Sequence, residues 1–341
     1  MLNNNPLFWI IDEEWSDYDI ETEIIKKYYP TASIKYSTYD YKDDLKKWGD
    51  KADIVLAQVY ADIPGDVIRR LKNCRGIALF GGGYDRVDIE VAAEMRIPVT
   101  NVKNYCKEDI AEYVINAMLY SNKALDSFNT VVEENLWGLG AIKNLQNRLS
   151  EQKLFVIGLG RIGKFVGKTA QALGMKVYAY DPQYRSGEKE DNIEMVSLEE
   201  GLAIADFVTV HCNLSEKTKS MLGMPEFLKM KSTGILINTA RGAILKENEL
   251  LEAVERKIIG GAVLDVIEQE PPTKEYYEKF RNSDVIVTPH ISYLSVQSID
   301  ELKHRSTKNG IAMLKGKLTD DVVNINDKGT LYDKFENYAK K

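Results

Sequence analysis

Residues Lys153 to Gly163 read KLFVIGLGRIG, an apolar strand that runs into a glycine-rich loop and then into a helix. Gly158, Gly160 and Gly163 have the G-x-G-x-x-G spacing. The first glycine permits a tight turn, the second lets a pyrophosphate approach the backbone, and the third lets helix and strand pack closely. The helix expected to begin near Arg161 would direct its free N–H groups at that phosphate.

A second apolar strand strengthens this prediction, because the glycine motif alone also occurs in turns that bind nothing. Residues 175–180 form the strand, and Asp181 ends it about twenty residues past the loop, where a carboxylate can bind the ribose hydroxyls of NAD. Asp181 would also repel the 2′-phosphate of NADP, although Arg185 lies close enough in sequence to soften that preference. The stretch therefore predicts an NAD-binding βαβ unit.

Length and composition are those of a two-domain globular protein. The chain has 341 residues, 44% hydrophobic and 28% charged, which is enough for two cores. A net charge of -7 gives no electrostatic reason to expect nucleic acid or an anionic membrane as partner. No signal-peptide pattern or membrane-spanning apolar run is present, so we expect a cytoplasmic protein. Cys74, Cys106 and Cys212 lack metal-ligand spacing, and neither a disulfide framework nor a metal site is expected.

Apolar strands alternate with helical segments on both sides of the glycine loop. The first series places strands at 7–11, 33–36, 53–57, 76–80 and 98–101, with helices at 19–29, 41–48, 64–73 and 87–95 between them. The second places strands at 207–210, 234–237, 261–264 and 285–287, each followed by polar residues. An aspartate near the start of the 19–29 segment can cap it. Such alternation predicts parallel sheets covered by helices, with ligands at the carboxyl edge.

Two further helices are expected outside these series. Residues 110–120 form a long apolar helix, and residues 133–151 a polar stretch that leads to the glycine-loop strand. The long helix at 295–313 comes after the last strand and is followed by a charged tail. Its position suggests that the chain returns to the first domain.

The three histidines can be considered one by one. His211 and His290 each follow an apolar strand, at the carboxyl edge where the cofactor is expected, whereas His304 lies among charged residues of a helix and is expected on the surface. Imidazole titrates near neutrality and is the natural proton carrier for a carbonyl–alcohol interconversion. A histidine taken at random is more often structural, so the assignment of His290 depends on its neighbours.

Arg241 and two carboxylates favour His290 as an acid–base group. Arg241, in ILINTARGAIL, follows a strand where a guanidinium could hold a substrate carboxylate by two parallel hydrogen bonds. Asp265 and Glu270, in GAVLDVIEQEPP, bracket a turn after another strand, and a carboxylate beside His290 would favour the imidazolium. A surface ion pair for Arg241 and a solvated acidic loop for the carboxylates are the alternatives.

Several separated motifs resemble the D-2-hydroxyacid dehydrogenases over nearly the whole chain. VIGLGRIG with VYAYDP, VTVHCNLSEKT, LINTARGAIL, GAVLDVIEQEPP and VTPHIS stand in that family's order and at about its spacing, while FGGGYDRVD and NVKNYC look like its substrate-loop and hinge segments. NYCKEDIAEYV and PHISYLSVQS look closest to the branch of C-terminal-binding proteins and their bacterial dehydrogenase relatives, which have an aromatic residue at the position of Tyr293.

The resemblance implies a role for each matching residue. Arg241, Glu270 and His290 would be catalytic: the arginine binds the 2-oxo carboxylate, the histidine is the acid–base group and the glutamate pairs with it. Gly82, Gly83, Tyr105 and Arg241 would contact the substrate, and Asp265 would accept a hydrogen bond from the nicotinamide carboxamide. The cofactor-binding residues would be Gly158, Gly160, Arg161, Ile162, Asp181, His211, Cys212, Asn213, Thr218, Thr239, Ala240, Arg241, Asp265, His290 and Tyr293.

The resemblance also implies an α/β fold of two doubly wound parallel-sheet domains with the active site between them. Residues 1–104 and 294–341 would form a flavodoxin-like substrate domain, and residues 105–293 an NAD-binding Rossmann domain. The implied function is an NAD-dependent D-2-hydroxyacid dehydrogenase, usually a homodimer to which the helix after Ile110 contributes. An NADH-sensing, corepressor-like binding protein with the same triad is the alternative.

The substrate pocket departs from the family pattern. Ser292 and Tyr293 replace a glycine pair that often follows the histidine, and the substrate loop is the unusual run Gly81 to Gly83. Formate oxidation is disfavoured because the resemblance implies a glutamine in place of Glu270 there, and a long 3-phosphoglycerate dehydrogenase because no regulatory domain is added. The identity of the 2-oxo acid stays open.

Overall fold

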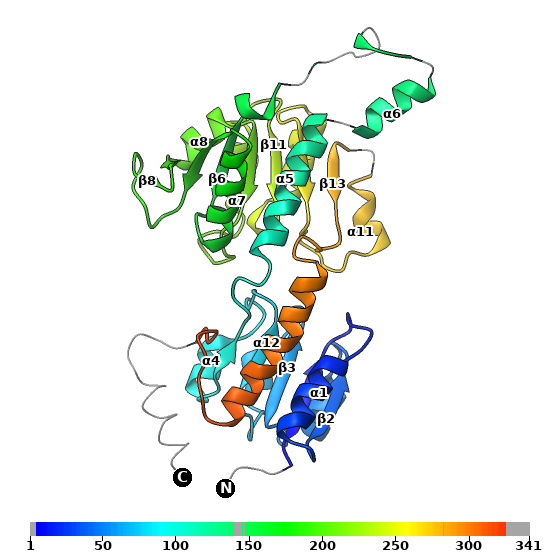
Figure 1. Cartoon of the computed structure of the whole chain (residues 1–341), viewed down its shortest axis with the longest axis vertical. Coiled ribbons are helices and arrows are strands. Elements are labelled where there is room, and N and C mark those ends of the chain that lie inside the picture. Colours follow the sequence, from blue (N-terminus) through cyan, green and yellow to red (C-terminus); the bar gives the residue numbers. More distant parts are fainter. Residues whose placement is uncertain are drawn as a thin grey trace. The chain divides into compact units, whose positions relative to one another are not determined.

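The computed structural model describes residues 5–123, 125–134, 136–139, 145, 147–281 and 283–324, with 125–128 described by backbone alone. The chain divides into two compact units (Figure 1). Unit 1 comprises Met1–Tyr105 and Ser295–Lys341, and unit 2 comprises Cys106–Leu294. The chain thus leaves unit 1, builds all of unit 2 and returns. The charged tail after residue 324 lies outside the described residues.

Unit 1 is built on a parallel sheet with the order β2-β1-β3-β4-β5, which is the flavodoxin-like arrangement. Its strands are β1 (Leu7–Ile11), β2 (Ser33–Ser37), β3 (Ile54–Gln58), β4 (Ile77–Phe80) and β5 (Val99–Thr100). Successive residues of β1 point to opposite faces: Phe8 and Ile10 lie in one buried core, and Trp9 and Ile11 in another. Burial on both faces explains why these strands read as continuous apolar runs.

Helices cover both faces of this sheet. They are α1 (Asp19–Tyr28), α2 (Lys42–Trp48), α3 (Gly65–Ile68), α4 (Ile89–Glu94) and α12 (Val296–Leu314). Ile25 of α1 and Ile311 of α12 pack on one face, and Leu45 of α2 and Val67 of α3 on the other.

Two local predictions for unit 1 differ from the structure. The helix expected at 64–73 ends at Ile68, because the Leu71 N–H bonds to the Ile68 carbonyl and turns the chain so that Leu71 enters the core. Helix α1 has Tyr18 as N-cap and no side-chain cap. Asp17 instead accepts the Asp19 N–H at 3.3 Å.

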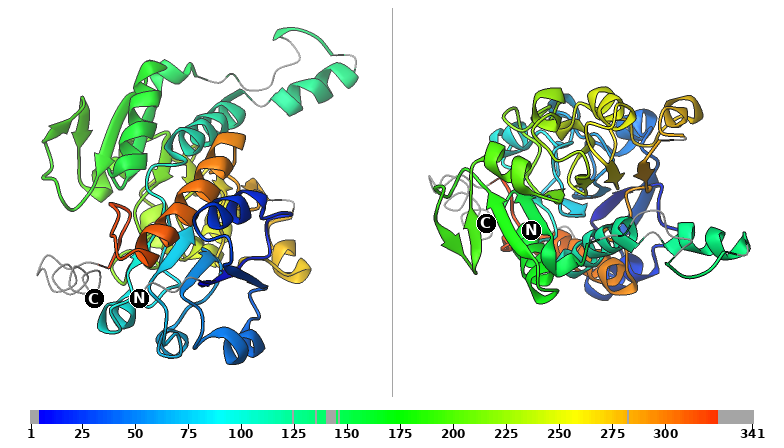
Figure 2. Two further views of the ribbon diagram at one scale, coloured as in Figure 1. Left: turned by 60° about the horizontal axis from the view of Figure 1, so that its bottom comes forward. Right: turned by 90° about the horizontal axis from the view of Figure 1, so that it is seen from above.

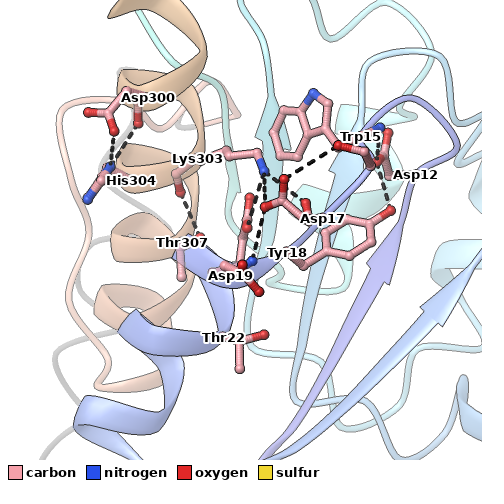
Figure 3. A network of polar contacts seen from close by, with 12 residues as sticks. Asp12, Trp15, Asp17, Tyr18, Asp19, Thr22, Asp300, Lys303, His304 and Thr307 are labelled. Atoms are coloured by element: carbon pink, nitrogen blue, oxygen red, sulfur yellow. Dashed lines mark hydrogen bonds and ion pairs between the residues drawn. The ribbon is translucent and has the colours of Figure 1, made fainter. Parts of the chain in front are cut away.

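Lys303 of α12 fastens that helix to the loop after β1 (Figure 3). Its buried ammonium donates to the Asp17 carbonyl at 2.8 Å and carboxylate at 3.3 Å, and lies 4.7 Å from the centre of the Trp15 ring. The Glu21 side chain is fully buried nearby, with its Oε2 3.9 Å from Lys303 Nζ. Among the described residues, neither oxygen of this carboxylate has a hydrogen-bond partner. Burial therefore raises the pKa of Glu21 to about 7, although the Lys303 charge opposes the shift.

His304 lies one residue further along α12. It is partly exposed and its Nδ1 is 2.9 Å from the Asp300 carbonyl oxygen (Figure 3). This is the surface position expected for it.

Unit 2 is built on a larger sheet with the order β13-β12-β11-β10-β6-β7-β9-β8. Its strands are β6 (Lys153–Ile157), β7 (Lys176–Tyr180), β8 (Lys189–Glu190), β9 (Ile193–Met195), β10 (Phe207–Val210), β11 (Ile235–Asn238), β12 (Gly261–Leu264) and β13 (Val285–Val287). All pairs are parallel except β8–β9 at one edge. Sequence patterns did not predict these two strands, because they are too short to show a periodicity.

Unit 2 contains further helices, several of which cover the two faces of its sheet. They are α5 (Lys107–Lys123), α6 (Leu125–Glu133), α7 (Arg161–Ala172), α8 (Leu198–Ile204), α9 (Met224–Phe227), α10 (Glu247–Glu255) and α11 (Lys274–Glu278), with short 3₁₀ turns at Leu149–Glu151 and Gly242–Ile244. Phe155 of β6 packs with α8, α9 and α10 on one face, and α7 packs with α5 beside β6. Helix α6 reaches away from the sheet (Figures 1 and 2). Within the described residues, no helix is both long and apolar enough to cross a membrane.

Candidate active site

Six parallel strands of unit 2 end at one edge of the sheet, and the loops after them carry the predicted site residues. The loops follow β6, β7, β10, β11, β12 and β13. Strand β6 lies between β7 and β10, so the chain order reverses there. Ligands of doubly wound sheets bind beside such a reversal.

The glycine loop after β6 fits a pyrophosphate. Gly158 has φ +94°, and a Cβ there would lie 2.6 Å from the Cys212 nitrogen; a Cβ at Gly163 would lie 2.1 Å from the Gly158 carbonyl oxygen. A Cβ at Gly160 would meet nothing within 4 Å, so this stretch of backbone can be approached. Helix α7 begins at Arg161, and its first N–H groups have no acceptors within the helix. These are the donors that a diphosphate requires.

Asp181 joins the loop after β7 to the glycine loop. Its Oδ2 accepts the Leu159 N–H at 3.0 Å and its Oδ1 the Gln183 N–H at 2.9 Å. Each carboxylate oxygen retains a further lone pair, so ribose hydroxyls can still bind. The same residue therefore shapes the loop and offers acceptors to a cofactor.

His211 is held between two threonines at the end of β10. Its Nε2 is 2.9 Å from the Thr209 hydroxyl, and its Nδ1 is 3.5 Å from that of Thr239. Desolvation lowers the pKa of His211 to about 3, which leaves the ring neutral at physiological pH. His211 is thus unsuited to carry a proton in catalysis, and its predicted cofactor contact stays a prediction.

The rest of this loop is ordered by Thr218. Its hydroxyl donates to the Asn213 carbonyl at 2.6 Å and accepts the Ser215 N–H at 2.8 Å. Cys212 lies against Gly158, because a Cβ added at Gly158 would overlap the Cys212 backbone. Of the cofactor-binding residues predicted here, His211 and Cys212 therefore border the glycine loop.

Arg241 stands on a loop that Asn238 closes. The buried Asn238 side chain accepts the Ala240 N–H at 3.0 Å and donates to the Arg241 carbonyl at 2.9 Å. The half-buried Arg241 guanidinium donates to the Ala240 carbonyl at 2.7 Å. Asn238 was not among the predicted site residues, although its place directly before T-A-R-G was a usable signal.

His290 and Glu270 form a close pair. His290 Nδ1 lies 2.9 Å from Glu270 Oε2, and both side chains are 16% exposed. Glu270 Oε1 accepts the Ile267 N–H at 2.9 Å. Desolvation acts to raise the pKa of Glu270, but the hydrogen bond and charge of His290, the Ile267 amide and the Arg241 charge together lower it. Glu270 is therefore ionised at physiological pH.

The backbone at His290 is unusual, and its neighbours hold it in place. His290 has φ +56°, a left-handed conformation that costs energy for a side chain of this size. The ring of Tyr293 meets its imidazole edge-on, with 6.3 Å between centroids. Backbone strain of this kind at a site residue is typical of groups whose orientation matters.

Asp265 clamps the chain on both sides of His290. The carboxylate, 1% exposed, accepts the Thr288 hydroxyl at 2.6 Å and the Ile291 and Ser292 N–H groups at 2.8 Å. Because Thr288 donates its proton to Asp265, the Tyr113 hydroxyl, 2.6 Å away on α5, donates to Thr288. The predicted contact of Asp265 with a nicotinamide stays a prediction.

In unit 1 the predicted substrate residues Gly82 and Tyr105 lie close together. The Gly82 carbonyl accepts the Asn101 amide at 2.7 Å, and a Cβ at Gly82 would lie 3.8 Å from the Tyr105 ring. Gly81 has φ +154°, and a Cβ there would lie 2.4 Å from the Val59 side chain. The absence of side chains at Gly81 and Gly82 thus lets this loop pass close to Val59 and Tyr105.

Known proteins with similar sequences are named as reductases and dehydrogenases of small hydroxy or oxo acids. The model of the D-isomer specific 2-hydroxyacid dehydrogenase NAD binding domain matches residues 115–292. The chain belongs to the D-isomer specific 2-hydroxyacid dehydrogenase family. The predicted family, NAD as cofactor and the oxidoreductase activity on 2-hydroxy acids are thereby confirmed.

Three relatives illustrate the range of the similarity. A hydroxypyruvate reductase of Thermotoga maritima is 34% identical over 73% of this chain and 81% of its own length. A glyoxylate reductase of Thermococcus litoralis is 30% identical over 89% of this chain and 92% of its own. The structure of Aquifex aeolicus D-lactate dehydrogenase with NAD and lactic acid is 25% identical, with a TM-score of 0.82 over 94% of this chain and 100% of its own. The predicted fold class is confirmed, and all three relatives are named as enzymes rather than as NADH sensors.

Proposed function

We propose that this chain reduces a small 2-oxo acid with NADH, and that Arg241, Glu270 and His290 are its catalytic residues. The observation that carries the proposal is the 2.9 Å contact between His290 Nδ1 and Glu270 Oε2. Arg241 stands on the neighbouring strand-end loop of the dinucleotide-binding sheet. An ionised glutamate on Nδ1 leaves Nε2 as the nitrogen that exchanges a proton with substrate.

Each catalytic residue has a separate task. The Arg241 guanidinium grips the substrate carboxylate with two parallel hydrogen bonds and polarises the neighbouring carbonyl. Glu270 stabilises the imidazolium of His290, which donates its Nε2 proton to the carbonyl oxygen as that oxygen becomes an alcohol. In the reverse direction the neutral imidazole takes the proton back. Bound NADH supplies the hydride.

The same proposal covers the cofactor and substrate contacts. The glycine loop with Arg161 and Ile162 would bind the pyrophosphate and Asp181 the ribose. The remaining predicted cofactor residues are His211, Cys212, Asn213, Thr218, Thr239, Ala240, Arg241, Asp265, His290 and Tyr293. Gly82, Gly83 and Tyr105 would bind the substrate. Residues 1–104 and 294–341 would form the substrate domain, and residues 105–293 the NAD-binding domain. The names of the relatives favour hydroxypyruvate or glyoxylate as substrate.

A substrate screen tests the activity. Purified protein with NADH should reduce at least one of hydroxypyruvate, glyoxylate, pyruvate, phenylpyruvate and branched 2-oxo acids. NADPH should give a lower kcat/KM, because the Asp181 carboxylate repels a 2′-phosphate. Absence of turnover with every 2-oxo acid would contradict the proposed reaction, and equal rates with NADPH would show that Arg185 neutralises the repulsion.

We also propose a cytoplasmic homodimer. Residues 136–139 expose the large apolar side chains of Trp137 (83%) and Leu139 (73%), and such side chains are often covered at an interface between protomers. The three cysteines are free thiols, which suits a reducing compartment. The acidic net charge of -7 favours no nucleic-acid partner. Sedimentation of the wild type and of Trp137→Ser with Leu139→Ser should show a dimer and its weakening; a wild-type monomer would contradict the dimer.

A further inference from the structure

The backbone of Ile267 and Glu268 lies where three parts of the site meet. The Ile267 N–H donates to Glu270 Oε1 at 2.9 Å. The next N–H, that of Glu268, donates to Glu247 Oε2 at 2.9 Å. A Cβ at Gly242 would lie 2.0 Å from the Ile267 carbonyl carbon, so the loop with Arg241 packs directly on this peptide.

Glu247 is well suited to fix this peptide. It begins α10 and its side chain is 2% exposed. Besides the Glu268 N–H, it contacts the Tyr276 hydroxyl and the Lys279 ammonium through Oε1. Lys279 Nζ in turn lies 3.6 Å from the centre of the Tyr276 ring. Hydrogen bonds to a buried charged acceptor are stronger than neutral ones, and removal of the acceptor leaves the donors unpaired.

We propose that Glu247 is a positioning residue for the reaction. By holding the 267–268 peptide, it sets the place of Glu270 and, through Glu270, the orientation of His290 relative to Arg241. Glu247 belongs to the same strand-end segment as Arg241, so one short stretch of chain carries the arginine and holds the loop of the glutamate. This inference rests on the roles proposed above for Arg241, Glu270 and His290.

Two substitutions at Glu247 and one control test the inference. Glu247→Met keeps the length of the side chain and removes the acceptor, whereas Glu247→Gln retains an oxygen for the Glu268 N–H. Glu249→Met is the matched control: on the same helix, Glu249 accepts the Met224 N–H at 2.5 Å, away from the 267–268 peptide. All four proteins are compared for kcat, KM, NADH affinity, the pH dependence of kcat/KM and Tm.

The expected pattern separates positioning from simple stability. Glu247→Met should lower kcat/KM by about 10- to 100-fold, since small misplacements of reacting groups cost that much. Its pH profile should shift, with NADH affinity kept, and Glu247→Gln should restore most of the rate. Glu249→Met should lower Tm without altering the pH profile. A Glu247→Met enzyme with lower Tm but wild-type kcat/KM and pH profile would overturn the inference.

The imidazole of His290 gives a readout that needs no turnover. The chain has three histidines, so a His290→Ala variant assigns the His290 signals in an imidazole NMR spectrum. These signals should move in Glu247→Met and stay in place in Glu249→Met; identical spectra would overturn the inference even if no substrate were found. If the wild type turns over no 2-oxo acid but the His290 signals shift in Glu247→Met, the proposed reaction is contradicted and the positioning role of Glu247 is not. If Glu247→Met does not fold, Tyr276→Phe, which removes one donor to Glu247, provides the same comparison.

Discussion

Glu270 owes its charge to its immediate neighbours. Desolvation alone would raise its pKa, and the imidazole, the Ile267 amide and Arg241 reverse that effect. The pair with His290 therefore consists of a carboxylate and a ring that this carboxylate helps to protonate. The acid–base behaviour of the site is thus set by contacts within a few ångströms.

Glu270→Gln should move the pH dependence in a defined direction. Without the negative charge the imidazolium is less stable, so 2-oxo acid reduction should fall off at a lower pH than in the wild type. The acidic limb of hydroxy-acid oxidation should move down as well, since that direction needs the neutral ring. Steady-state rates of reduction and oxidation between about pH 5 and pH 10 measure these two limbs of the pH profiles. Unchanged pH profiles would show that Glu270 does not stabilise the imidazolium of His290.

Arg241→Lys should lose most activity although the charge is kept. A compact ammonium cannot reproduce the planar two-point grip of a guanidinium on a carboxylate. We expect kcat/KM for the 2-oxo acid to fall by at least about 100-fold, as for the loss of a positioning clamp, while NADH affinity changes little. Arg256→Lys is the control and should behave as wild type, because Arg256 is an exposed arginine at the C-cap of α10 that pairs with Glu252. Near-complete retention of kcat/KM in Arg241→Lys would rule out Arg241 as carboxylate anchor.

At the scale of the element, the loop after β13 depends on groups distant in sequence. Asp265 is 23 residues from Thr288, and Tyr113 is 175 residues from it. Together they fix the turn that holds His290 at φ +56°. A loop so held carries its side chain in one orientation without needing a bound ligand.

Thr288→Val should loosen this loop. The substitution keeps the shape of the side chain but leaves Asp265 with one donor fewer and the Tyr113 hydroxyl without its acceptor at Thr288. We expect a loss of about 1–2 kcal/mol in the free energy of unfolding, with a lower kcat. Thr169→Val is the control, because the Thr169 hydroxyl donates to the Phe165 carbonyl within α7. Urea unfolding and steady-state kinetics measure both effects; equal losses in the two variants would show that the Thr288 hydroxyl has no special role.

The sequence predicted the elements better than the connections between them. Buried parallel strands are apolar runs, and the glycine loop has a fixed spacing, so β6, β7 and the strands on either side could be located from local pattern. The helix at 64–73 proved shorter, because tertiary packing of Leu71 ends it early. Asn238, Thr288 and Tyr113 were missed, since a buried polar side chain shows its partner only in three dimensions.

At the scale of the whole molecule, the last described helix, α12, follows unit 2 in the sequence and completes unit 1. Helix α12 packs on the sheet core of unit 1, and Lys303 ties it to the loop after β1. The buried Glu21 beside that tie has no hydrogen bond to its carboxylate among the described residues. Unit 1 thus contains a titratable group whose burial costs free energy when it is charged.

Glu21 should make stability fall as pH rises. Its pKa is raised from 4.5 to about 7, so the folded protein binds this proton more tightly than the unfolded chain does. The free energy of unfolding should therefore decline between pH 4.5 and about pH 7. Asp12, Asp17 and Lys303 also act on Glu21, and the first two strengthen the shift.

Glu21→Gln tests this directly. The variant should be more stable than wild type at pH 8, by as much as about 3 kcal/mol, and the difference should shrink toward pH 5. Glu23→Gln, exposed on the same helix, should show no such dependence. Urea unfolding at both pH values measures it. A variant that is less stable at pH 8 would mean that the Lys303 ion pair outweighs the burial of Glu21.

The central claim is that His290 transfers the proton in an NADH-dependent reduction, and His290→Ala tests it most directly. NADH oxidation by the variant with the best 2-oxo acid should fall by at least about 100-fold, since general acid catalysis contributes that much or more. NADH binding, followed by its fluorescence, should survive, because the glycine loop and Asp181 are untouched. Turnover close to wild type in a variant that binds NADH normally would contradict the account.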